Sequence, residues 1–247
     1  MNLLKISAVS YLNTIPFVYG ILKSGHLENF RLDLDVPSVC AEKLKDGEVD
    51  VALVPVGAIP DFDDPFIVSE YCIGAVGKVK TVLLLSQKPL EQIDSIYLDN
   101  DSRTSVKLVK VLAENYWKIR PSWNNLNPGQ SDRPEKLESL VAIGDKTFEL
   151  VKQYKYVIDL AEEWYRFTGL PFVFAVWLSK KQLPAIFKDQ LNDALSYGLK
   201  HKAESLEYFI DKVPLCGDCL SYLENNISFQ FDEEKKKGLE LFLKYIS

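Results

Sequence analysis

The chain begins with short apolar stretches that alternate with amphipathic ones, a pattern typical of strands followed by helices. Residues 3–8 form an apolar run that predicts a buried strand, and residues 15–23 predict a helix. Residues 31–36 alternate at period two, residues 39–45 place apolar side chains on one helical face, and residues 49–54 form another apolar run. Three strand–helix units in about sixty residues predict a parallel sheet with helices on its faces.

A second series of strands and helices follows the first. Its apolar runs predict a strand at 80–86 and another at 95–98, and the periodicity of residues 103–117 predicts an amphipathic helix. A second long apolar strand is expected at 172–178, and from residue 184 onward the chain has helical periodicity. The remaining strands are predicted at 122–123, 140–143 and 157–160.

The order of these elements predicts two lobes. An α/β lobe leads into a long strand, a second α/β lobe, a long returning strand, and helices that complete the first lobe. Chains that cross twice between lobes form hinged clefts, where ligand pockets concentrate. We therefore expect an α/β, two-lobe periplasmic-binding-protein-like fold (type 2), with two crossover strands and a ligand cleft between the lobes. Residues 1–86 plus 178–247 are assigned to lobe 1, and residues 87–177 to lobe 2. The alternative is one larger α/β domain, because 247 residues suit both.

Charge and hydropathy restrict the partners. The chain is 47% hydrophobic and 26% charged, and its net charge of -6 comes from basic residues scattered among acidic ones. We expect no nucleic-acid partner, because a phosphate-tracking surface requires clustered basic side chains. No apolar run reaches the ~20 residues that span a bilayer, and the start of the sequence has none of the features of a signal peptide. A cytoplasmic protein without membrane contact is therefore expected, with a small molecule as its partner.

The cysteines suit the same expectation. Cys40 and Cys72 stand in apolar settings, where a thiol is most often buried. Cys216 and Cys219 form a Cys-x-x-Cys motif, which a redox centre or half of a zinc site would use. A zinc site requires a second pair of ligands, and the two histidines lie far from the motif and from each other. We expect a structural role for the motif and no metal.

A polar turn between the first strand and the first helix is the first candidate binding site. Asn13 or Thr14, followed by Pro16, reads as a helix start. Capping leaves the crowding of Ser10, Tyr11 and Asn13 on one turn unexplained. Because ligands bind outside the carboxyl ends of parallel strands, this turn predicts one wall of a small-molecule site.

The turn at Ser102, Arg103, Thr104 and Ser105 is its counterpart in the second lobe. A helix start offers free N–H groups and the positive end of the helix dipole, and three hydroxyls stand beside them. Ser102 acting as a simple helix cap is the alternative interpretation. Capping uses one hydroxyl, however, so the additional hydroxyls and Arg103 favour a carboxylate site.

Three further places are candidates for the cleft. Asp145, which follows Gly144 at a strand end, either reaches a ligand or caps the next helix, and capping is the better supported. Thr81 begins the first long strand, where ordinary packing is the alternative. Trp164 and Trp177 either wall an aromatic ligand or pack in the core. The sequence contains no recognisable phosphate loop, nucleophile triad or metal cluster.

Five runs occur in one order across roughly residues 4–180: SYLNTIP at 10–16, DVALVP at 50–55, SRTSV at 102–106, IGD at 143–145 and TGLPFVFAVW at 168–177. Together they closely resemble the chorismate dehydratase family of the futalosine route to menaquinone. Of the five runs, SYLNT and TGLPFVFAVW are the ones specific to this family. The related dihydroxynaphthoate synthases of the same pathway share the fold, but the SYLNT run is similar to the dehydratase branch.

The resemblance implies a lyase that removes water from chorismate, a dianion, and gives 3-[(1-carboxyvinyl)oxy]benzoate. Aromatisation drives this reaction, so no cofactor is implied. No His or Glu stands out as general base, which leaves the substrate's own carboxylate or water as proton acceptor. The resemblance also implies roles for individual residues. Asn13 acts on the reacting part of the substrate, with Ser10 and Tyr11 beside it. A carboxylate binds to Ser102, Thr104 and Ser105, with Arg103 as an ion-pair partner, and the further substrate-binding residues are Thr81, Gly144 and Asp145.

A non-catalytic protein that binds a small carboxylate is the competing interpretation, because this fold alone does not specify chemistry. Turnover of chorismate separates the two interpretations. A homodimer through the helical C-terminal part is compatible with the sequence, although no particular residue argues for it.

Overall fold

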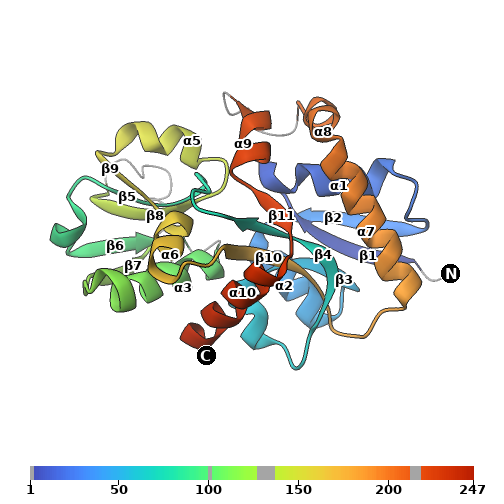
Figure 1. Cartoon of the computed structure of the whole chain (residues 1–247), viewed down its shortest axis with the longest axis horizontal. Coiled ribbons are helices and arrows are strands. Elements are labelled where there is room, and N and C mark those ends of the chain that lie inside the picture. The colour runs from blue at the N-terminus through green and yellow to red at the C-terminus, as the bar shows by residue number, and fades with distance from the viewer. Residues whose placement is uncertain (1–2, 100–101, 127–136, 212–217) are drawn as a thin grey trace.

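The computed structural model describes residues 3–99, 102–126, 137–211 and 218–247. Its strands form two sheets that lie at opposite ends of the molecule (Figure 1). The first sheet has the order β11-β4-β10-β3-β1-β2, built from β1 (Leu4–Val9), β2 (Phe30–Asp35), β3 (Val51–Pro55), β4 (Phe66–Ala75), β10 (Phe172–Ser179) and β11 (Ser228–Gln230). The second has the order β7-β6-β8-β5-β9, built from β5 (Val82–Ser86), β6 (Ser95–Leu98), β7 (Ser122–Asn125), β8 (Ser139–Ile143) and β9 (Tyr156–Asp159).

The N-terminal part confirms the predicted strand–helix units. Strand β1 pairs in parallel with both β2 and β3. The helices between them are α1 (Ile15–Lys23) and α2 (Pro37–Asp46), which ends at Gly47 with φ of 76°. The chain moves from β1 to one neighbour and then back past β1 to the other, so right-handed crossovers place α1 and α2 on opposite faces of the sheet.

The second lobe contains α3 (Arg103–Leu112), α5 (Thr147–Leu150) and α6 (Leu160–Thr168). Helix α3 continues as a π-helical turn over residues 113–117, so the helix predicted for 103–117 is confirmed with a change of winding near its end. Helix α6 was not predicted from the sequence. The Asp159 side chain accepts from the backbone N–H groups of Ala161 and Glu162 and so begins this helix.

The C-terminal part returns to the first lobe through α7 (Ala185–Lys200), α8 (Lys202–Tyr208), α9 (Cys219–Asn225) and α10 (Glu233–Ile246). Helices α1 and α7 cross at Gly20 and Gly198, where an added Cβ would lie 2.0 Å and 1.7 Å from a backbone carbonyl oxygen of the other helix. Only a residue without a Cβ permits this approach. The short strand β11, at the edge of the first sheet, was missed because its three residues are too few to show a period of two.

The predicted boundaries between the lobes require a correction. Strand β5 was assigned to lobe 1, yet it pairs with β8 and β9 in the second sheet. Strand β10 was assigned to lobe 2 up to residue 177, yet it pairs with β3 and β4 in the first sheet. Apolar runs identify buried strands but not their partners, so neither long strand itself spans the lobes. The change of sheet falls between β4 and β5 and between β9 and β10.

The connection from β4 to β5 leaves the first sheet where the connection from β9 to β10 enters it, because Phe172 at the start of β10 pairs with Ala75 at the end of β4. The buried apolar side chains continue from one lobe into the other, from the strands of the first sheet to α3 and α6. Cys40 and Cys72 are buried free thiols, as expected. Cys216 lies outside the described residues, as does Asp101 beside the second polar turn. Within the described ranges no helix is long and apolar enough to cross a membrane.

Candidate functional site

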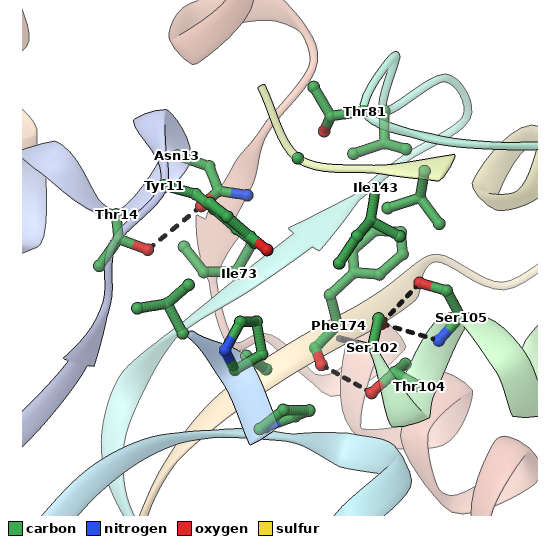
Figure 2. Close-up of a pocket in the computed structure, with 17 residues that line it drawn as sticks. Tyr11, Asn13, Thr14, Ile73, Thr81, Ser102, Thr104, Ser105, Ile143 and Phe174 are labelled. Atoms are coloured by element: carbon green, nitrogen blue, oxygen red, sulfur yellow. Dashed lines mark hydrogen bonds between the residues drawn. The ribbon is translucent and has the colours of Figure 1, made fainter. Parts of the chain in front are cut away.

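A cavity lies between the two lobes, where the polar turn after β1 faces the start of α3 and the end of β8 (Figure 2). Its empty volume, which includes open solvent at the mouth, is about 540 Å³. The described residues that line it carry no charged side chain; they are Val9, Tyr11, Asn13, Thr14, Pro37, Pro55, Ile73, Val79, Thr81, Val82, Ser102, Thr104, Ser105, Ile143, Gly144, Phe174 and Ala175. Hydroxyl and amide groups on apolar walls therefore make up its chemistry.

Asn13 lies on the 3₁₀ turn η1 (Leu12–Thr14), which precedes α1. Neither Asn13 nor Thr14 caps α1 with its side chain, so the predicted capping is wrong. Instead the Thr14 hydroxyl donates to Asn13 Oδ1 at 3.1 Å. With its oxygen fixed in this way, the Asn13 amide nitrogen points into the cavity (Figure 2). The site therefore has an oriented amide donor on the lobe 1 side.

Tyr11 lines the cavity and lies against Gly144 of the second lobe. An added Cβ at Gly144 would be 3.1 Å from Tyr11 Cζ, and the residue has φ of +70°, a region that favours glycine. Gly144 therefore does not bind a ligand through a side chain. It allows the Tyr11 ring to close on the end of β8, which brings the two walls together.

Asp145 also joins the lobes. Its two carboxylate oxygens accept from Leu12 N at 3.3 Å and 3.2 Å, at the first residue of η1. Helix α5 has no side-chain cap, so the predicted capping role of Asp145 is wrong. The pKa of the Asp145 carboxyl is raised from 3.8 to about 6, because the effect of burial exceeds the opposing effect of the hydrogen bond from the Leu12 N–H. Asp145 is absent from the cavity lining; it fixes the turn that carries Asn13.

Ser102 and Ser105 line the lobe 2 wall as a pair. Ser102 Oγ accepts from Ser105 N at 3.1 Å, which makes Ser102 the N-cap of α3. The two hydroxyls are 2.8 Å apart, and either can be the donor. One hydroxyl proton of the pair remains for a ligand, because a single hydrogen bond between two hydroxyls uses one proton. Both the capping and the anion-site interpretations of this turn are therefore compatible with the geometry.

Thr104 also lines the cavity, but its hydroxyl serves the fold. Thr104 Oγ1 accepts from Gly57 N at 3.0 Å and donates to Phe174 O at 3.4 Å. The backbone of Gly57 on η2 (Val56–Asp61) approaches so closely that an added Cβ would lie 2.8 Å from Thr104 Cα. The predicted hydrogen bond from Thr104 to a ligand carboxylate is thus replaced by hydrogen bonds between lobes.

Ser10 and Arg103 are not among the lining residues. Ser10 is exposed, and its backbone N–H donates to Asp35 O at 2.9 Å. Arg103 forms ion pairs with Asp61 and with Glu42, both from the first lobe, so its side chain points away from the cavity. The sequence placed both residues on the correct turns, but a turn does not specify which of its side chains face inward.

Thr81 is buried, lines the cavity, and has a partner that the sequence did not identify. Its Oγ1 is 2.8 Å from the hydroxyl of Tyr222 on α9.

Trp164 and Trp177 are fully buried, and they pack edge-on against Phe172 and Phe17, respectively. Core packing is therefore confirmed for both tryptophans, and the aromatic side chains at the cavity are those of Tyr11 and Phe174.

Solved structures share this architecture. A protein from Archaeoglobus fulgidus has a TM-score of 0.77 at 11% identity, over 98% of this chain and 95% of that one. The periplasmic aliphatic sulphonate binding protein SsuA from Escherichia coli has a TM-score of 0.60 at 13% identity, over 99% and 92%. Together with the two sheets and the interlobe cavity, these similarities define the chain as a protein of the periplasmic-binding-protein-like fold, as predicted.

The sequence comparisons give the family. A family model described as menaquinone biosynthesis matches residues 4–247. The chain is 25% identical to a chorismate dehydratase from Thermus thermophilus, over 94% of this chain and 91% of that protein. It is 26% identical to a chorismate dehydratase from Campylobacter jejuni, over 96% and 94%. The chain belongs to the menaquinone biosynthesis family.

Proposed function

We propose that this protein is a chorismate dehydratase and catalyses the first step of the futalosine route to menaquinone. The observation that carries the proposal is the interlobe cavity itself: an oriented Asn13 amide faces the capped start of α3 across a space with apolar walls. Similarity to two chorismate dehydratases over nearly the whole chain supports it.

The reaction removes the proton on C3 and the hydroxyl on C4 of chorismate. The electron pair of the C3–H bond forms the new ring double bond, the C4–O bond breaks, and water leaves with 3-[(1-carboxyvinyl)oxy]benzoate. We assign Asn13 to the reacting part of the ring, where an amide donor stabilises negative charge as it develops on oxygen. The Ser102–Ser105 pair and the start of α3 bind a carboxylate through hydrogen bonds and the helix dipole.

The proton acceptor follows from what lines the cavity. The lining residues of the described chain include neither a histidine nor a carboxylate. Asp145 follows the lining residue Gly144, but both of its oxygens are directed at Leu12 N. We therefore propose that the substrate's own carboxylate, or a water molecule that it holds, accepts the proton, and that the enzyme fixes the geometry of this intramolecular step.

A binding protein for small carboxylates is the alternative, because the fold also occurs in the sulphonate binding protein. The test is to incubate the purified protein with chorismate and follow the aromatic product by absorbance and mass. Product formation supports the proposal. Tight binding of chorismate without product supports the binding protein instead. Because dihydroxynaphthoate synthases of the same pathway share the fold, rapid turnover of their substrate without turnover of chorismate would move the assignment to that activity.

A further inference from the structure

Tyr222 on α9 belongs to the C-terminal part of the chain, yet its hydroxyl reaches the cavity wall. The residue is 3% exposed, and its hydroxyl lies 2.8 Å from Thr81 Oγ1. The Asn13 side chain also lies close enough to this hydroxyl to act on its pKa. Burial raises the pKa of Tyr222 above its usual range, so the side chain is a neutral phenol at physiological pH. One hydroxyl therefore bonds to Thr81, just before β5, and lies near the Asn13 side chain of the lobe 1 turn.

The hydrogen-bond inventory of these side chains favours one direction. Because Asn13 Oδ1 already accepts from Thr14, the part of the Asn13 side chain that remains to act on Tyr222 is the amide nitrogen, which is a donor. With a donor on the Asn13 side of the phenol oxygen, the phenol directs its own proton to Thr81 Oγ1. The Thr81 proton is then free to point into the cavity that Thr81 lines. The second amide proton of Asn13 remains for the ligand.

The geometry points to Tyr222 as a positioning residue for the reaction, an inference that rests on the proposed function. Through its hydroxyl it orients the Thr81 hydroxyl and the Asn13 amide toward the substrate. It does not itself line the cavity. Helix α9 thereby couples the C-terminal part of the chain to the site, and it lies between the two lobes in Figure 1.

The ring of Tyr222 is held independently of its hydroxyl. It packs edge-on against Phe148 of α5, with ring centroids 5.4 Å apart and an angle of 90°. On the same helix end, Asn226 Nδ2 donates to Lys78 O at 3.1 Å. The substitution Tyr222→Phe therefore removes the oxygen and keeps these contacts, which separates the positioning role from the packing role.

The experiment measures kcat and KM for chorismate in Tyr222→Phe, Thr81→Val and the double variant. We expect Tyr222→Phe and Thr81→Val each to lower kcat about tenfold or more while KM changes less than about threefold, because orientation is lost and not binding. The double variant should lose little beyond either single change, because both disrupt one hydrogen-bond chain. Thr81→Ser restores a hydroxyl and should recover most of kcat. Tyr208→Phe, an exposed tyrosine on α8, is the matched control and should match the wild type.

The outcomes are distinguishable. An active wild type with an equally active Tyr222→Phe overturns the inference and leaves the proposed function intact, as does an additive double variant. A wild type that does not turn over chorismate overturns the proposed function and the inference with it. Melting temperatures verify that each variant folds. If Tyr222→Phe does not fold, the comparison of Thr81→Val with Thr81→Ser decides, since equal kcat in these two variants contradicts an oriented Thr81 hydroxyl.

Discussion

The two walls of the cavity are both polar turns between a strand and a helix, but their polar side chains are used differently. At the start of α3, Ser102 caps the helix and the Thr104 hydroxyl joins Gly57 to Phe174. At the start of α1 no side chain caps the helix, and the Asn13 amide is directed at the cavity. The hydroxyls at the start of α3 thus take part in holding the fold, whereas the Asn13 amide nitrogen at the start of α1 is directed at the cavity.

The uncapped turn is held from the opposite lobe. Asp145 accepts from the first N–H of η1, and Gly144 allows the Tyr11 ring to close on β8. The turn that carries Asn13 is thus completed by contacts that exist only when the lobes are together. Contacts with the other lobe therefore hold the lobe 1 turn, whereas the start of α3 has its own cap in addition to the interlobe hydrogen bonds of Thr104.

Removal of the Asn13 amide is expected to have the largest effect. Asn13→Ala should lower kcat for chorismate about 100-fold, because a preorganised donor at developing charge is lost. Steady-state turnover of the purified variant measures this. Ser10→Ala is the matched control, since Ser10 lies on the same turn but is exposed and outside the lining. Turnover of Asn13→Ala equal to that of Ser10→Ala would remove Asn13 from the mechanism.

Thr104→Val should change stability and leave substrate binding nearly intact. The variant leaves the buried Gly57 N–H without its acceptor, which costs about 1–3 kcal/mol of unfolding free energy. Chemical denaturation gives this value, and KM for chorismate should change less than about twofold. A large rise in KM with unchanged stability would show instead that Thr104 binds the substrate, as the sequence suggested.

Gly144→Ala tests the contact that closes the lobes, with Gly169→Ala as its control. Both glycines have left-handed φ, +70° and +73°, so each alanine costs about 1–2 kcal/mol in backbone strain. Only at Gly144 does the new Cβ meet the Tyr11 ring; at Gly169 nothing lies within 4 Å. We expect a raised KM in Gly144→Ala and an unchanged KM in Gly169→Ala. Equal KM values in the two variants would mean that the Tyr11–Gly144 contact is unimportant for binding.

Asp145 should give the protein a pH-dependent stability. Its pKa is raised from 3.8 to about 6 in the folded protein, so the folded state binds more protons between these pH values. Its contribution to stability therefore falls as pH rises from about 4 to about 6 and is constant above that. Asp145→Asn does not titrate, so its melting temperature relative to the wild type should be higher at pH 7.5 than at about pH 4. A difference that is the same at both pH values contradicts this sign.

The sequence predicted where the strands and helices lie better than it predicted which strands pair with one another. An apolar run located β6 at Ser95–Leu98 with its observed bounds, and the helical periodicity from residue 184 onward agrees with helices α7 to α10. It missed β11, because three residues are too few to show a period of two. It assigned the long strands β5 and β10 to the wrong lobes, because strand pairing is a long-range property that an apolar run does not contain.

The residues of the candidate site likewise fall into those that the sequence placed correctly and those that it did not. Local sequence was sufficient to place Asn13, Tyr11, Ser102 and Ser105 at a cavity, since polar residues at the carboxyl ends of strands carry that signal. It was insufficient for Ser10 and Arg103, which share those turns and point away. It contained no sign of Tyr222, which lies 141 residues from Thr81 along the chain and on an ordinary amphipathic helix.

By itself, then, the sequence determined the α/β class, most elements, the family resemblance and the two polar turns, because these depend on residues close together in the chain. Tertiary structure decided how Thr104, Thr81 and the turn at Leu12 are used, since the hydrogen-bond partners of all three lie far away in the sequence. The Asn13 amide is available to a ligand because Thr14 holds its oxygen and Asp145 holds its turn. The first of these partners is a sequence neighbour, and the second lies 133 residues from the Leu12 N–H that it accepts.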